Sequence, residues 1–191
     1  NWTTYLGYYK TVPELASAID AKATWTIGKG FMADEITTMQ LSAITGWGKD
    51  SFNTILENAV RTYHVGGDSF CEIIRDPEDP NRIINLKPLD PGNIRIIANR
   101  KGLILRYEQL NRIAGTKNKR WKPEDMFHLA RNRVADEIHG VSIIPAVEEI
   151  IKMRQEAMAD YRKLLHRNVF PVRIWYLDTD KAAEIATFKA K

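Results

Sequence analysis

A long amphipathic segment constrains this chain more than any other feature. From Ser142 to about Arg167, apolar residues recur mostly at steps of three, four or seven, which predicts one face of an α-helix. The apolar positions are Ile143, Val147, Ile150, Ile151, Ala157, Met158, Tyr161, Leu164 and Leu165. At 1.5 Å per residue, a helix of roughly 25 residues is about 37 Å long, which is as long as a small domain is wide. We therefore expect part of this helix to pack on something outside its own domain.

The polar residues of the segment agree with a helix that begins at Ser142. Ser142 is a suitable N-cap, and Pro145 falls in the first turn, where its missing N–H costs little. Acidic residues gather near the start and basic residues near the end, as the helix dipole favours. The polar face mixes both signs of charge and is not the basic face of a helix that grips nucleic acid.

Before this helix, the sequence predicts an α+β fold with a small, mostly antiparallel sheet, flanking helices and one long projecting amphipathic helix. Helices are expected from Pro13, capped by Thr11, to just before Gly28, and over about 51–63, capped by Asp50 or Ser51. A type II turn is expected at Pro91-Gly92, and Asp178 is expected to cap a final helix. The expected strands span residues 69–75, 83–88, 93–98, 103–109, 126–130 and 169–177.

Composition limits the class of protein without choosing one. The 191 residues are 44% apolar and 27% charged, which allows a sizeable core. No apolar run reaches the roughly 18 residues that a membrane span needs, so no membrane partner is expected. The net charge of +4 permits contact with nucleic acid but does not require it. Because the last predicted helix is cut off by the end of the chain, we expect the chain to be a fragment.

Four short patterns could carry chemistry, and each has a simpler structural interpretation. Gly28-Lys29-Gly30 lacks the spacing of a phosphate-binding loop and fits a helix C-cap. Asp136, Glu137 and His139 could ligate a metal, or could form a solvated turn. Cys71, the single cysteine, fits a buried inert thiol in a reducing compartment. The basic loop Lys117–Lys122 could contact DNA or RNA, or could be a soluble hairpin tip.

Several patches, in order, resemble the tailed-phage portal protein family. They cover about residues 15 to 175 and comprise Ala21–Gly30, Gly66–Phe70, Leu86–Pro91, Pro123–Leu129 and Asp136–Ser142. The last two are similar to a family strand of the form Pro-x-Asp-hydrophobic-x-His and to a Gly-x-Ser start of a helix.

The resemblance implies a non-catalytic subunit of a homo-oligomeric ring, usually of twelve copies, at one vertex of the virion capsid. Double-stranded DNA would pass non-specifically through the ring, which would meet terminase, the major capsid protein and head-tail connector proteins. Assembly would occur in the host cytoplasm. No cofactor is implied. Residues 1–140 would be the wing, 141–168 the stem and 169–191 the start of the clip.

In such a ring, three sets of residues are predicted to make contacts: with DNA, with the neighbouring subunit and with partner proteins. DNA or phosphate contacts are predicted for Lys152, Arg162, Lys163, Arg167, Lys117, Lys119 and Arg120. The subunit interface is predicted to use Ile143, Val147, Ile150, Met158, Tyr161 and Leu165, and the partner-facing clip Arg173, Trp175 and Tyr176.

Two other classes of function stay open from the sequence. One is a metal-dependent nuclease or phosphoesterase that uses Asp136, Glu137 and His139. The other is a stand-alone nucleic-acid-binding module that uses Lys117–Lys122.

Overall fold

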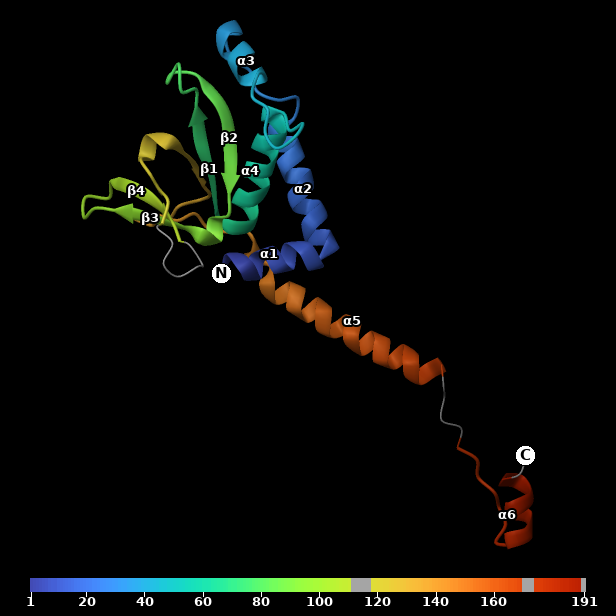
Figure 1. Ribbon diagram of the computed structural model, residues 1–191. Helices are drawn as coiled ribbons and strands as arrows, with labels where there is room; N and C mark the ends of the chain where they lie inside the picture. The colour runs from blue at the N-terminus through green and yellow to red at the C-terminus, as the bar shows by residue number, and fades with distance from the viewer. Residues whose placement is uncertain (111–117, 170–173, 190–191) are drawn as a thin grey trace. The chain divides into compact units, whose positions relative to one another are not determined.

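The computed structural model describes residues 1–110, 118–169 and 174–189 (Figure 1). The chain forms two compact units, the body Asn1–Glu149 and a C-terminal unit Ile150–Lys191. The predicted α+β class is confirmed, because the body combines helices with two small antiparallel sheets. Within the described residues, no helix combines the length and apolar character required to span a membrane.

The helices of the body are α1 (Trp2–Thr11), α2 (Pro13–Ile27), α3 (Glu35–Ser42) and α4 (Phe52–Gly66). The prediction for α4 is confirmed: Ser51 caps it by accepting the Thr54 amide at 3.3 Å, and Gly67 ends it at φ +89°. At this φ a side chain would be strained, which explains the glycine. Gly28 likewise ends α2, as predicted, at φ +55°.

Helices α1 and α3 were not predicted from the sequence, and the predicted cap of α2 lies at the wrong residue. Thr11 is the last residue of α1, and its hydroxyl donates to the Gly7 carbonyl at 2.9 Å. Val12 therefore occupies the N-cap position of α2, and the prediction that Thr11 caps this helix is wrong. In α3, Asp34 is the cap and accepts the Thr37 amide at 3.1 Å.

Two three-stranded antiparallel sheets replace the single predicted one. The first has the order β2-β1-β6, with β1 (Asp68–Arg75), β2 (Ile83–Leu89) and β6 (Met126–Ala130). The second has the order β3-β4-β5, with β3 (Ile94–Ala98), β4 (Ile104–Gln109) and β5 (Arg120–Trp121). All strands predicted over residues 69–130 are present, and β5 is an addition in the segment predicted as a loop.

A short 3₁₀ helix, η1 (Pro91–Asn93), separates the two sheets where a type II turn was predicted. The Asp90 carboxylate accepts the Gly92 amide at 3.0 Å and the Asn93 side-chain amide at 2.7 Å. These bonds hold the turn in 3₁₀ geometry, so the type II prediction is wrong. The chain therefore leaves the first sheet before it begins the second.

Three apolar clusters hold the body together. One joins the two sheets, one packs α4 on the first sheet, and one packs the aromatic side chains of α1 against α2 and α4. Their most buried members include Phe70, Ile44, Cys71, Ile19, Val65 and Ile144. Each fully buried side chain of this size contributes about 1.5–3 kcal/mol to folding.

The long amphipathic helix is confirmed, but it begins later than predicted. A 3₁₀ helix, η3 (Ile144–Ala146), precedes α5 (Glu148–Val169), so Ser142 does not cap an α-helix. Residues 174–177 form no strand, whereas residues 170–173 of the predicted strand lie outside the described residues. The last helix, α6, spans Ala182–Lys189, so Asp178 is not its cap.

Candidate functional site

The connection between β6 and α5 is held to the body by several hydrogen bonds. We call residues 131–143 the hinge segment. Its anchor is Asp68, the first residue of β1, which follows directly on the glycine that ends α4. Asp68 is 6% exposed, and burial of a carboxylate without partners would cost several kcal/mol.

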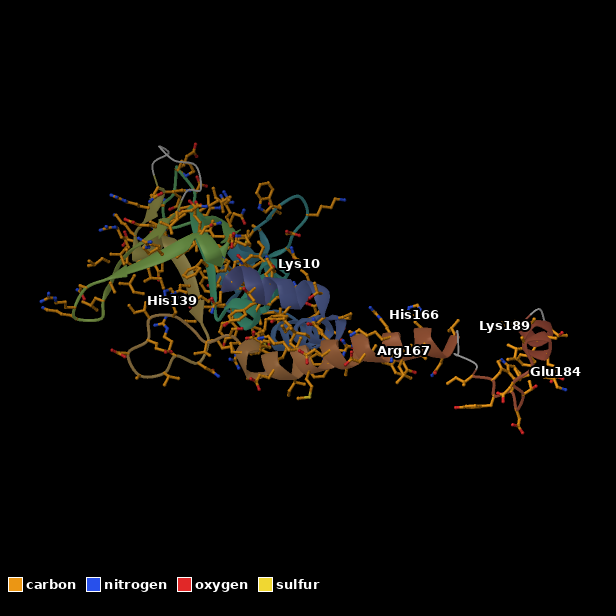
Figure 2. All side chains as sticks on the ribbon, turned by 90° about the horizontal axis from the view of Figure 1, so that it is seen from below. Lys10, His139, His166, Arg167, Glu184 and Lys189 are labelled. Carbon is orange, nitrogen blue, oxygen red and sulfur yellow. The ribbon has the colours of Figure 1, made fainter. Side chains whose placement is uncertain are left out.

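Three donors meet the Asp68 carboxylate. Its Oδ1 accepts the Gly140 amide at 2.9 Å and lies 2.9 Å from Nε2 of His128 in β6. Its Oδ2 lies 2.8 Å from Nδ1 of His139, which belongs to the hinge segment. Figure 2 labels His139. Burial would raise the pKa of Asp68, but the hydrogen bonds from His128, Gly140 and His139 outweigh it, so the pKa lies below its usual value.

The network continues from His128 into the core of the body. The His128 ring stacks on Phe70 with centroids 4.5 Å apart, and its Nδ1 lies 3.2 Å from the Tyr107 hydroxyl. Burial raises the pKa of Tyr107, with a smaller rise from Asp68 and an opposing effect of Arg133. The hinge segment is thus tied to both sheets through one carboxylate.

Backbone contacts fix the same segment to the end of α4. The Arg131 amide donates to the Gly67 carbonyl at 2.8 Å, and the Val141 amide donates to the Arg131 carbonyl at 2.7 Å. Gly67 and Gly140 approach so closely that a Cβ on either would collide with the carbonyl of the other. Glycine is required at both positions because no side chain fits there.

Ser142 completes this attachment in place of capping a helix. Its buried hydroxyl donates to the Val65 carbonyl at 2.7 Å and accepts the Ile144 amide at 3.0 Å. The Ile143 amide donates to the His64 carbonyl at 3.2 Å. A hydroxyl so engaged cannot cap a helix that begins at Glu148, which accounts for the misplaced start of the predicted helix.

A cavity of about 490 Å³ borders this network. Its lining residues are Asn1, Trp2, Thr3, Gly66, Asp68, Phe70, Pro91, Gly92, His139 and Gly140. This lining carries no lysine or arginine.

The predicted metal ligands do not converge. Asp136 and Glu137 are exposed, whereas His139 is turned to Asp68. Within the described ranges, which include the whole hinge segment, no group of three His, Cys, Asp or Glu side chains is placed to hold a metal ion. Cys71 is buried, as predicted, and burial raises its thiol pKa to about 12.

The predicted DNA contacts lie in different parts of the chain. Lys152, Arg162, Lys163 and Arg167 are exposed on α5, and Lys163 pairs with Asp160 at 3.0 Å. Figure 2 labels Arg167 near the C-terminal end of this helix. Lys117 lies outside the described residues.

The two other predicted contacts of the basic loop are already paired with acids. Lys119 lies 2.6 Å from Glu72 and over the Trp121 ring, and Arg120 lies 3.0 Å from Glu108.

The predicted interface residues divide between the two units. Ile143 packs against the cluster of Ile19, Val65 and Ile144, and Val147 is partly buried. Ile150, Met158, Tyr161 and Leu165 are 44–66% exposed on α5.

Of the predicted clip residues, Arg173 lies outside the described residues. Trp175 and Tyr176 are exposed, and Trp175 meets Phe188 of α6 edge to face, with ring centroids 5.6 Å apart.

Asp68, Tyr107 and His128 were not singled out from the sequence. Asp68 and His128 are 60 positions apart, and Asp68 and His139 are 71 apart, so no local pattern joins them. The available signal was an ionisable residue inside one apolar strand, His128, and another directly before a second, Asp68; such residues are uncommon in a core unless they pair.

Comparison with known proteins identifies the fold but no family. No protein-family model matches the sequence, and no curated protein sequence matches it. Among solved structures, the chain is similar to one in the virion of a native gene transfer agent (GTA) particle, at 14% identity and a TM-score of 0.73, over 98% of this chain and 53% of that chain.

Two neck structures give similar results. The neck of the native GTA particle, computed with C12 symmetry, matches over 97% of this chain at a TM-score of 0.70. The neck of the empty GTA particle, computed with C6 symmetry, matches over 95% at the same TM-score. Both are 14% identical, and the chain covers 53% and 52% of their chains. The chain shares the fold of these particle components and spans about half their length.

Proposed function

We propose that this chain is part of a portal-like ring subunit of a virion, through which double-stranded DNA passes. The observation that carries the proposal is the shared fold over 98% of the chain with a GTA virion component, together with the C12 symmetry of a related neck. The sequence patches that resemble portal proteins point the same way. A structural role, with motor activity in a terminase partner, follows from this proposal.

The exposed side chains of α5 support assembly into a ring. A helix turns about 100° per residue, so Ile150, Tyr161 and Leu165 share one face, and each is 45% exposed or more. In a ring, the neighbouring copy would cover this face, which would otherwise leave apolar surface in water.

The opposite face of α5 suits loose contact with DNA. Lys152 and Lys163 lie three turns apart on that side, and Arg167 lies one turn further. Glu156 stands among these basic residues, so the face is only moderately positive. DNA that moves through a channel needs weak, sequence-independent contact with its phosphates, and this arrangement supplies it.

Light scattering on the protein at its natural length tests the proposal. We expect a discrete mass of about twelve subunits, or of another closed ring. A monomer at every concentration would contradict it. Mg²⁺- or Mn²⁺-dependent cleavage of DNA that Asp136→Ala abolishes would favour the nuclease alternative instead.

A further inference from the structure

Helix α3 carries apolar side chains that are largely exposed. It has eight residues, and none of them is buried. Isolated helices of this length are marginal in water. Leu41 of α3 packs, partly buried, against the apolar cluster of Ile44 and Ile55, whereas Ile36 and Met39 remain exposed. Five large apolar side chains in α3 or close to it in sequence are 71–100% exposed, and we call them the α3 patch: Trp25, Met32, Ile36, Met39 and Trp47.

A second apolar surface lies at the tip of the β3–β4 hairpin. Leu103 is 62% exposed and Leu105 is 52% exposed, and the neighbouring Arg100 and Lys101 are exposed as well. We call these four residues the hairpin patch. Figure 1 shows α3 and the β3–β4 hairpin at different ends of the body, with β1, β2 and α4 between them.

The two patches carry opposite charge. From Trp25 to Trp47, the span of the α3 patch, the charged side chains are one lysine, Lys29, and two acids, Asp34 and Glu35, so the span is acidic by one charge. From Arg95 to Arg106 every charged side chain is basic. Opposite charges across an interface favour the correct pairing and penalise contact between like patches.

We infer that the α3 patch of one copy of this chain binds the hairpin patch of the next copy. Two different, complementary patches on one molecule form a head-to-tail contact, and such contacts close into a ring when the rotation allows. This inference rests on the proposed ring, and it names a contact between bodies that is separate from α5. If a different protein covered the α3 patch, there would be no reason for this chain to carry the complementary hairpin patch.

Paired cysteines test the contact directly. We would introduce Met39→Cys and Leu105→Cys together in the protein at its natural length and add a short bis-maleimide. Native Cys71 should not interfere, because it is 1% exposed and its thiol pKa is about 12. We expect a ladder of cross-linked oligomers from the double variant and no product from either single variant. Dimers from Met39→Cys alone would show that like patches meet, and would overturn the inference.

Charge reversal gives an independent measurement. Glu35→Arg and Arg100→Glu should each raise the concentration for half-assembly by about tenfold or more, and the combination should restore it. Lys10→Glu on α1 is the matched control and should change nothing.

Microscopy of the same samples separates this inference from the proposed function. If rings form although the double-cysteine variant gives no cross-linked oligomers, and if the charge reversals do not change assembly, the inference is wrong and the proposed function still stands. Absence of rings and ladders together would overturn both.

Discussion

At the scale of single residues, Asp68 connects the hinge segment to the rest of the body. It joins three donors from β6 and the hinge segment, and His128 extends the connection to Phe70 and Tyr107. None of this can be read from local sequence, because the partners meet only after both sheets have formed. Cys71 is different: its place in an apolar run was enough to predict a buried, inert thiol.

Asp68→Asn should lower the free energy of unfolding by about 2–3 kcal/mol at pH 7, because one of the donors loses its acceptor. The low pKa of Asp68 stabilises the fold above the usual carboxyl value of 3.8, and this contribution is lost as the pH falls through the lower folded value. Urea unfolding of both proteins at several pH values measures the difference. The difference in unfolding free energy between the two proteins should be largest at neutral pH and should decrease below about pH 3.8. A difference that does not change with pH would contradict the role of the charge.

Gly140→Ala should destabilise the body by about 1–3 kcal/mol, because its new Cβ would collide with the Gly67 carbonyl. Gly7→Ala is the matched control: its Cβ meets nothing within 4 Å, and alanine favours α1 by up to about 1 kcal/mol. Thermal unfolding of the two variants should therefore shift in opposite directions. Equal shifts would show that the close approach of Gly67 and Gly140 is unimportant.

At the scale of elements, the sequence predicted those that carry a clear cap or period. Ser51 and Gly67 delimit α4 as expected, and the strands predicted over residues 69–130 are present. Helix α3 escaped prediction because none of its residues is buried, so no apolar stripe marks it. The start of α5 was misplaced because Ser142 bonds to Val65, a contact between segments 77 positions apart.

Replacement of Tyr161 and Leu165 by lysine should abolish assembly while leaving the fold intact, because both side chains are exposed in the single chain, at 56% and 45%. The control is Glu156→Lys with Asp160→Lys, which adds the same number of lysines away from the apolar face. Sedimentation velocity reports the assembly, and circular dichroism reports the fold. If the first pair of substitutions left assembly intact and the second pair abolished it, the interface would lie on the opposite face of α5 from the one proposed.

At the scale of the whole molecule, the chain combines a body with two sheets and a C-terminal unit in which many large apolar side chains are exposed, although Ile151 is buried. The α+β class and the long helix followed from periodicity, which is a local property. The division into two sheets did not, because it depends on the turn that Asp90 stabilises and on the packing of Phe70 between the sheets. Ring assembly depends on neighbouring copies and is the central proposal.

Negative-stain microscopy of the protein at its natural length tests that proposal most directly. We expect rings with an axial hole and a rotational symmetry that recurs among averaged views. Compact single particles at every concentration, or dimers without a hole, would contradict it.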